Sequence, residues 1–425
     1  MTALRRTLPA VVLAAMAVTV AAGMWLARHD GRELGLPFPP FVGRWDPAAT
    51  AWALAAGALV VLAAWGAPRL LALRPAAFAT AVFAGTLALR LALAGASRGT
   101  DGWWRVFDPD GFEGANEYVP ALSALQYGPG VFLDRFAELV PALPVHAAGH
   151  PPGLLVVMDA LGVTTPGRLA ALCIVGGALA APLTYALGRQ LGDERRARLA
   201  ALLTAVAPSA LLFGATSADA LFATLGLLAA WPLAARSWGA RTAGALLLAV
   251  ASLFAWSLLA VGAFAAVLAW RREGVRTLLL LGLLCGVVLL AVHAAFAALT
   301  GFDPVGTLRA TEGVYRFGIA AERPYWFWLP GSPTAFLVMA GLPVAWLALR
   351  ALAGGDAAAV AIFTVIVVAA VAGFTKAEVE RIWLTFVPFL CLAAAAALQD
   401  RHVRLVVAAL GAQALAWELA WNTVW

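Results

Sequence analysis

Long apolar runs separated by short arginine-bearing turns make up most of this 425-residue chain. A run of about 20 apolar residues is long enough to cross a bilayer as a helix, so we predict an all-α polytopic membrane protein with about 12 or 13 spans. The expected helices cover 8–27, 50–66, 76–96, 167–188, 197–214, 219–235, 276–299, 334–350, 357–374, 383–398 and 404–422, with 242–270 as a hairpin of two short helices.

Two polar segments, 97–152 and 301–333, interrupt the apolar pattern and are predicted to be large loops on one face. The run 153–162 is too short to span and is expected to form a partial helix. We predict three regions: two N-terminal helices in 1–75, a module in 76–300 that includes the first loop, and a C-terminal part in 301–425.

Arginines between the apolar runs predict the orientation, because cytoplasmic loops of membrane proteins are enriched in Arg and Lys. Clusters at 69–74, 189–198, 271–276 and 401–404 are expected in the cytoplasm, together with the N-terminus. The segments 97–152, 301–333 and 375–381 then face outside, and we expect them to cover one cavity.

Composition excludes a soluble domain, since 63% of the residues are hydrophobic and only 12% are charged, against roughly 25% in soluble proteins. The net charge of +6 comes mainly from arginines at helix ends, so no nucleic-acid partner is expected. Cys173, Cys285 and Cys391 all lie in apolar runs and predict no disulfide framework. The five histidines lack metal-ligand spacing, so we expect no obligatory metal or cofactor.

Glu117 is the strongest candidate for chemistry in the first loop. It precedes Tyr118 at the start of a predicted short amphipathic helix, and the chain returns to the membrane at His150-Pro151-Pro152. A carboxylate at the lipid interface can act as a general base when partial burial raises its pKa. Loop carboxylates are more often simply solvated.

Four segments in this order resemble the GT-C membrane glycosyltransferases, which include protein O-mannosyltransferases and aminoarabinose transferases, and among them an actinobacterial branch. They are Asn116-Glu117-Tyr118, Ala-Gly-His-Pro-Pro-Gly at 148–153, Arg323-Pro324-Tyr325 and Glu-Val-Glu-Arg-Ile-Trp at 378–383. Members often carry Asp-Glu where this chain has Asn-Glu, which leaves Asp101 as an alternative base.

The resemblance implies a GT-C-like bundle in a bacterial plasma membrane. It further implies inverting transfer of a sugar such as mannose from a polyprenyl phosphate to a hydroxyl of a glycan, lipid or protein. The leaving lipid phosphate requires fixed positive charge. The residues expected to hold it are His150, Arg316, Arg323, Lys376 and Arg381, and those expected to line the substrate pocket are Tyr118, Asp219, Tyr325 and Trp328.

A transporter or flippase of lipid-linked sugars is the alternative. It would use the same cavity without chemistry and would need polar groups near the middle of the bilayer. The predicted helices offer few of these, namely Asp159, His293 and Glu418.

Overall fold

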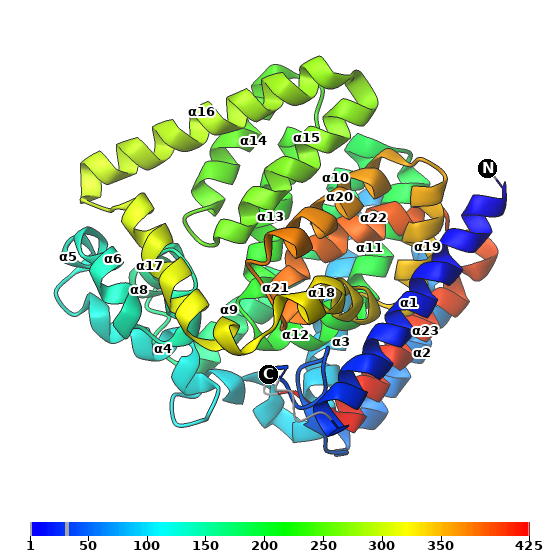
Figure 1. The fold of residues 1–425 in the computed structure, drawn as a ribbon. Coiled ribbons are helices and arrows are strands. Elements are labelled where there is room, and N and C mark those ends of the chain that lie inside the picture. The colour runs from blue at the N-terminus through cyan, green and yellow to red at the C-terminus, as the bar shows by residue number, and fades with distance from the viewer. Residues whose placement is uncertain (1, 30–33, 424) are drawn as a thin grey trace.

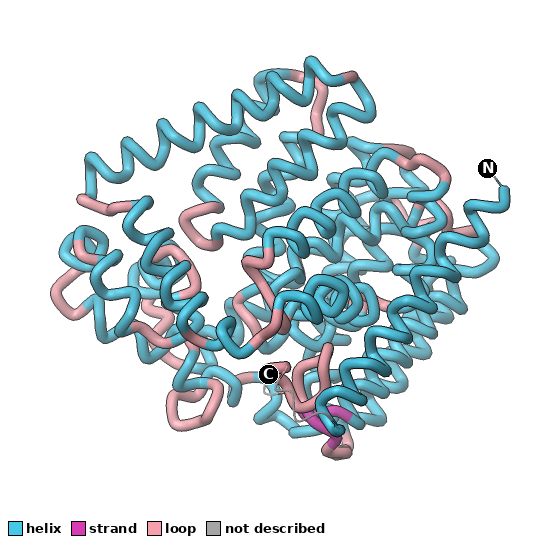
Figure 2. The backbone as a smooth tube through the Cα atoms, viewed as in Figure 1, coloured by secondary structure: helices cyan, strands magenta, loops and turns pink. Residues whose placement is uncertain are grey.

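The computed structural model describes residues 2–29, 34–423 and 425, which fold into a bundle of helices (Figure 1). Within this part of the chain, the strands are β1 (Arg44–Trp45) and β2 (Trp421–Asn422). They pair antiparallel in one short ribbon, which joins segments from opposite ends of the sequence (Figure 2). The predicted all-α class is confirmed.

Six helical segments are long and apolar enough to cross a membrane singly: Thr7–His29, Trp52–Leu70, Pro75–Trp103, Pro166–Leu191, Val275–Thr300 and Asp400–Ala420. The number rises to eight if each of two bent helix pairs is one span. The protein is therefore an integral multi-pass membrane protein. This count is lower than the expected number of about 12 or 13. Two predicted spans fold as helices of 10–17 residues, Asp219–Leu233 and Ala357–Ala372, whereas Trp238–Ala251 and Leu259–Glu273 are the two short helices of the predicted hairpin.

The α-helices are α1 (Thr2–His29), α2 (Trp52–Leu70), α3 (Pro75–Arg98), α4 (Tyr118–Ala121), α5 (Pro129–Asp134), α6 (Phe136–Leu139), α7 (Val145–Ala148), α8 (Gly153–Ala160), α9 (Pro166–Ala178), α10 (Ala180–Leu191), α11 (Glu194–Val206), α12 (Pro208–Thr216), α13 (Asp219–Leu233), α14 (Trp238–Ala251), α15 (Leu259–Glu273), α16 (Val275–Thr300), α17 (Pro304–Phe317), α18 (Tyr325–Met339), α19 (Leu342–Ala353), α20 (Ala357–Ala372), α21 (Val379–Ile382), α22 (Val387–Ala395) and α23 (Val403–Ala420). Short 3-10 helices are η1 (Gly99–Trp103), η2 (Arg105–Phe107), η3 (Gly114–Asn116), η4 (Leu122–Leu125), η5 (Val140–Ala142), η6 (Trp256–Leu258), η7 (Ile319–Glu322), η8 (Trp383–Phe386) and η9 (Asp400–His402).

A proline and a glycine explain the bends in the two bent helix pairs, α11–α12 and α18–α19. Pro208 begins α12 and disfavours helical backbone at Ala207, whose ψ of 130° bends α11 and α12 by 56°. At the break between α18 and α19, Gly341 adopts a φ of +111°, a conformation that favours glycine, and the two helices turn by 112°. Arg323, two residues before α18, donates to the carbonyl oxygen of Lys376 in the segment before α21.

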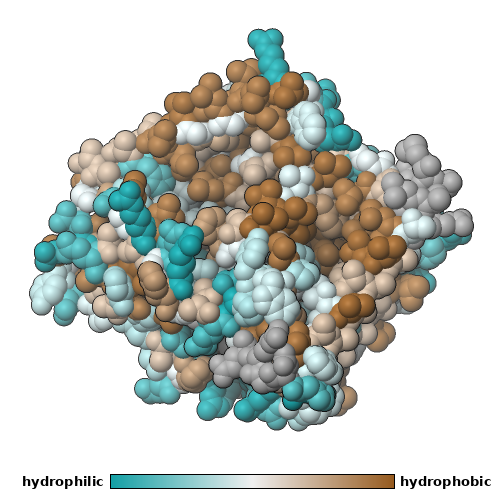
Figure 3. Space-filling view, viewed as in Figure 1, coloured by the Kyte–Doolittle hydropathy of each residue, from teal (hydrophilic) through white to brown (hydrophobic). Residues whose placement is uncertain are grey.

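The bundle surrounds α22, which is buried along its whole length and packs against α11 and α19. The two N-terminal helices pack on one side, α1 against α18 and α19, and α2 against α3 and α23. At the opposite edge α16 packs against α14 and α15 (Figure 1). Its Leu279, Leu283 and Leu290 are exposed, and hydrophobic side chains gather over this part of the surface (Figure 3). Such a surface suits contact with lipid.

Polar segments gather at one end of the bundle, which we call the loop end and define as residues 99–152, 302–324 and 374–382. The first segment carries α4 to α7, and α17 of the second packs against α6. Hydrophilic side chains are frequent at the lower left of Figure 3, near these short helices. The short helix predicted after Glu117 is α4, and the partial helix predicted at 153–162 is α8.

Candidate functional site

Glu113, Glu117 and His146 meet at the loop end, and we call them the acid–histidine cluster. Glu113 precedes η3 and Glu117 follows it with extended backbone. This tight turn needs Gly114, because a Cβ there would lie 1.8 Å from the carbonyl oxygen of Asp108. His146 lies on α7 and approaches from the other end of the first loop. The three ligand-type atoms lie within 4.8 Å of one another.

Glu117 is the most buried carboxyl group of this cluster, with 1% of its surface exposed. His146 Nε2 donates to Glu113 Oε1 at 2.6 Å and lies 3.9 Å from Glu117 Oε1. Glu117 Oε2 is buried and has no hydrogen-bond partner among the described residues. Burial raises the pKa of Glu117 to about 7, although the charges of His146 and Arg381 oppose this shift. The carboxyl group can therefore exchange a proton near neutral pH.

Burial alone would lower the pKa of His146, but the charges of Glu117 and Glu113 outweigh burial and raise it. A third partner of the cluster is Trp425. Its Nε1 donates to Glu113 Oε1 at 2.9 Å, and its ring lies 4.3 Å from the guanidinium carbon of Arg381. Trp425 thus connects the first loop to the segment that carries α21.

Arg381 begins a chain of buried ion pairs. It donates to Asp219 Oδ2 at 2.6 Å and lies 3.4 Å from Glu378 Oε2. Its side chain is 6% exposed and that of Asp219 is 5% exposed. The Ser217 hydroxyl donates to the same Asp219 oxygen at 2.7 Å. Charges so deeply buried require this pairing, because an isolated one would lose its hydration without compensation.

Arg323 continues the chain of ion pairs toward Lys376. Its Nη2 lies 2.5 Å from Glu378 Oε1, and its Nη1 donates to the carbonyl oxygen of Lys376 at 2.7 Å. Burial alone would raise the pKa of Glu378, but Arg323 and Arg381 outweigh burial and hold it below its usual value. Ala377 and Glu378 both have left-handed φ, at 66° and 57°. Non-glycine residues rarely adopt this conformation, so the surrounding contacts hold a strained turn.

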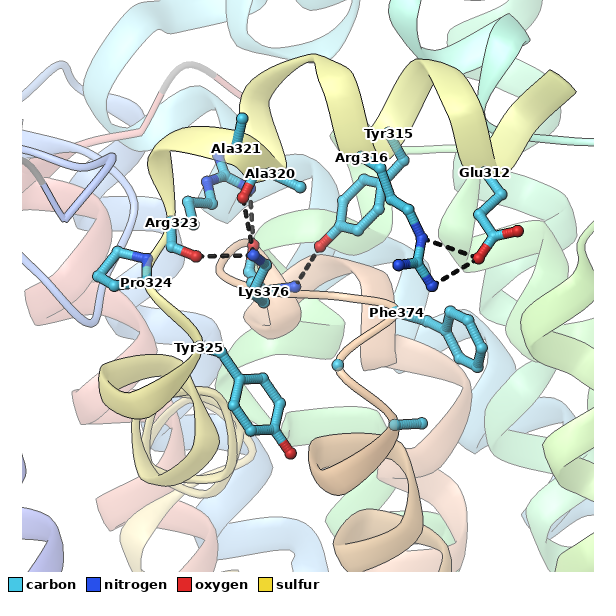
Figure 4. A pocket seen from close by; sticks show the side chains of 12 residues that line it. Glu312, Tyr315, Arg316, Ala320, Ala321, Arg323, Pro324, Tyr325, Phe374 and Lys376 are labelled. Carbon is cyan, nitrogen blue, oxygen red and sulfur yellow. Dashed lines mark hydrogen bonds and ion pairs between the residues drawn. The ribbon is translucent and has the colours of Figure 1, made fainter. Parts of the chain in front are cut away.

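A cavity of about 500 Å³ opens beside this turn (Figure 4). Lys376 lines it, and its Nζ donates to the carbonyl oxygens of Ala320 and Arg323, each at 2.7 Å. Burial and the nearby Arg323 and Arg316 lower the pKa of Lys376. Arg316 pairs with Glu312 at 2.7 Å. Among the described residues no carboxylate pairs with the Lys376 ammonium group.

His150 and Tyr118 are buried beside the start of α13 and do not line this cavity. Their ring centres are 6.3 Å apart, and the His150 ring lies 5.0 Å from that of Phe222. Burial lowers the pKa of His150 to about 4, so its imidazole is neutral at pH 7. Its Nδ1 is buried without a partner among the described residues. His150 can therefore offer a hydrogen bond, but it supplies no fixed positive charge.

The structure brings together most of the predicted site residues. Buried near one another are Glu117, Tyr118, His150, Asp219 and Arg381, and around the cavity lie Arg316, Arg323, Tyr325 and Lys376.

Two predicted site residues lie elsewhere. Asp101 is half-exposed and lies 3.7 Å from Arg105, and no contact joins it to the acid–histidine cluster among the described residues. Trp328 is buried against Phe327, donates to the carbonyl oxygen of Leu34 at 3.1 Å, and does not line the cavity.

Sequence reasoning missed Glu113, His146, Glu378 and Trp425 as members of the site. Glu113 and Glu117 are four residues apart, as are His146 and His150. This spacing puts residues on one face of a continuous helix, but turns separate the members of each pair. Only the assembled loop shows that His146 belongs with the carboxylates.

Comparison with known proteins found no matching family model, no similar curated protein and no similar solved structure.

Proposed function

We propose that this protein is a membrane glycosyltransferase that takes a sugar from a polyprenyl phosphate and delivers it to an acceptor hydroxyl at the extracytoplasmic face. The observation that carries the proposal is the buried Glu117 carboxyl group with one oxygen unpartnered among the described residues, beside a chain of cationic groups that leads to an open cavity. Chemistry that needs a proton acceptor next to an anionic leaving group fits this arrangement.

Glu117 is the general base in this proposal. Its Oε2 takes the proton from the acceptor hydroxyl, and the acceptor oxygen forms a bond to the anomeric carbon. The bond between that carbon and the phosphate oxygen breaks, and its electron pair leaves with the lipid phosphate. Because attack and departure occur on opposite faces, the configuration inverts.

Lys376 is the best candidate to hold the donor phosphate. Arg381 and Arg323 already share the carboxylates of Asp219 and Glu378, whereas Lys376 donates only to carbonyl oxygens. Its charge is therefore available to a phosphate in the cavity. Arg316 is exposed and can turn from Glu312 to the same ligand. Arg323 and Arg381, which are buried, add positive electrostatic potential at the phosphate position.

The donor's apolar tail would leave the cavity along α20. Tyr325 and Phe374 line the cavity, and the Tyr325 hydroxyl donates to the carbonyl oxygen of Val371 at 2.6 Å. Val367, Val368 and Val371 expose more than half of their surface. A prenyl chain lying on these residues would stay in contact with membrane lipid.

The test measures transfer of radiolabelled sugar from a panel of polyprenyl-phosphate sugars in membranes that contain wild type, Glu117→Gln, Asp101→Asn or Glu138→Gln. Glu138 is the matched control, since it lies in the same loop but its side chain is 72% exposed. We expect Glu117→Gln to reduce transfer by roughly 10²- to 10⁴-fold, while the other two variants stay close to wild type.

Loss of transfer in Asp101→Asn instead would assign the base to Asp101. If wild type transfers no sugar from any donor, while liposomes containing it move the same lipids between leaflets, the transporter or flippase function replaces the enzyme.

A further inference from the structure

We propose that the acid–histidine cluster is a binding site for one divalent transition-metal ion of the zinc type. An ion bound there inhibits the protein because it coordinates the Glu117 carboxylate, which is the proposed general base. Its ligands are carboxylate oxygens of Glu113 and Glu117 and Nε2 of His146. The binding of the ion is independent of the proposed function, whereas its inhibitory effect rests on it.

The geometry is close to that of a three-ligand site. In tetrahedral zinc coordination, ligand atoms at about 2.0–2.2 Å from the ion lie about 3.3–3.6 Å apart. His146 Nε2 lies 2.6 Å from Glu113 Oε1 and 3.9 Å from Glu117 Oε1, so the observed distances lie on either side of that spacing. Small side-chain rotations would exchange the His146–Glu113 hydrogen bond for bonds to the ion.

A second observation points to a ligand at this position. Glu117 Oε2 is buried and unpartnered among the described residues, although a buried carboxylate oxygen normally has a donor. Two carboxylates within 4.8 Å of one imidazole nitrogen also match a divalent ion in charge. Trp425 donates to Glu113 at 2.9 Å and would orient this ligand from outside the coordination sphere.

The choice of ion follows from the ligands. An imidazole nitrogen with two carboxylates is typical of zinc and its first-row neighbours, whereas magnesium and calcium prefer oxygen ligands alone. Three protein ligands leave a fourth position open. A Glu117 carboxylate bound to the ion can no longer accept a proton, so ion binding and the proposed base function exclude each other.

Cobalt(II) tests the binding, because its visible absorption reports tetrahedral coordination without any assay of activity. The purified full chain in detergent is stripped of metal with a chelator and titrated with Co²⁺, and Zn²⁺ is then added to displace it. The variants are Glu113→Gln, His146→Gln and, as a matched control, His402→Gln at an exposed histidine. A thermal unfolding scan of each verifies that it is folded.

We expect wild type and His402→Gln to bind one equivalent of Co²⁺, and Glu113→Gln and His146→Gln to bind it at least about 10- to 100-fold more weakly. Absence of binding in wild type, or equal binding in all four folded proteins, overturns the site. Zn²⁺ should also lower sugar transfer by wild type, and a rise in transfer overturns the inhibitory role. If no donor supports transfer, the proposed function fails while the Co²⁺ titration still decides whether the ion binds.

Discussion

Asp219→Asn removes the negative partner of the most deeply buried ion pair at the loop end. The Asp219 and Arg381 side chains are 5% and 6% exposed, and their charged atoms are 2.6 Å apart. With an effective dielectric constant of about 20, their Coulomb attraction is roughly 6 kcal/mol. The desolvation of both groups offsets much of this attraction. Removing one partner of a buried pair typically costs about 3–5 kcal/mol, because the remaining charge stays buried without compensation.

Arg381 retains a second partner, Glu378, at 3.4 Å. We therefore expect Asp219→Asn to lower the free energy of unfolding by about 3 kcal/mol, at the lower end of that range. The measurement is reversible chemical denaturation of the purified protein in detergent micelles. Asp159→Asn, at an exposed aspartate on α8, is the matched control and should change stability by less than about 0.5 kcal/mol.

A double-mutant cycle with Arg381→Met separates the pair from the single groups. If the ion pair forms as described, the double variant loses about 1–3 kcal/mol less than the sum of the two single variants. Additive losses, or an Asp219→Asn variant as stable as the Asp159→Asn control, would show that Asp219 and Arg381 form no stabilising ion pair.

Three further predictions concern Lys376, Trp425 and Glu380. Lys376→Met should raise the KM for the lipid-phosphate donor about 10- to 100-fold in the transfer assay, because it removes a charged hydrogen bond of about 1.5–3 kcal/mol. Lys376→Arg, which keeps the charge, should lose less. Trp425→Phe loses the hydrogen bond to Glu113 but keeps a ring beside Arg381. It should therefore destabilise the protein by about 1 kcal/mol in denaturation, and Trp425→Leu by more; equal losses would contradict the ring contact. Burial raises the pKa of Glu380 from 4.5 to about 7. This carboxyl group therefore favours folding below pH 4.5, and its contribution is lost as the pH rises through about 7. Glu380→Gln should remove up to about 3 kcal/mol of pH dependence between these values, and an unchanged pH profile would contradict the shift.

The fold class followed from the sequence because apolar runs and arginine turns are local signals. The number of full-length spans could not be predicted, because a short apolar helix such as Asp219–Leu233 has the same composition as part of a longer span. Among site residues, Glu117 was predicted from its place beside Tyr118 in the loop that ends at His150. His146 was missed because its partners are far away in sequence, and Trp425 because a terminal tryptophan has no pattern. Trp328 was predicted from an aromatic run, yet its indole points to Leu34.

The connection between α1 and α2 contacts the loop end, which gives the N-terminal helices a structural role. Val42 N–H donates to Glu380 Oε1 at 2.8 Å, one residue before Arg381. The carbonyl oxygen of Val42 accepts a hydrogen bond from Trp421 at 3.1 Å, beside the ribbon of β1 and β2.

The same connection limits the space around the ion-pair chain. A Cβ on Gly35, whose φ is +76°, would lie 2.7 Å from Cγ of Arg323. Arg323 is therefore held between this connection and Glu378, and Glu380 between Val42 and the core. These contacts fix both ends of the turn that carries Lys376 and Arg381. Because that turn has two strained residues, Ala377 and Glu378, contacts from outside it are needed to keep its conformation. The connection between α1 and α2 thus stabilises the positions of Arg323 and Arg381, and the described residues of these two helices supply no side chain for the proposed chemistry.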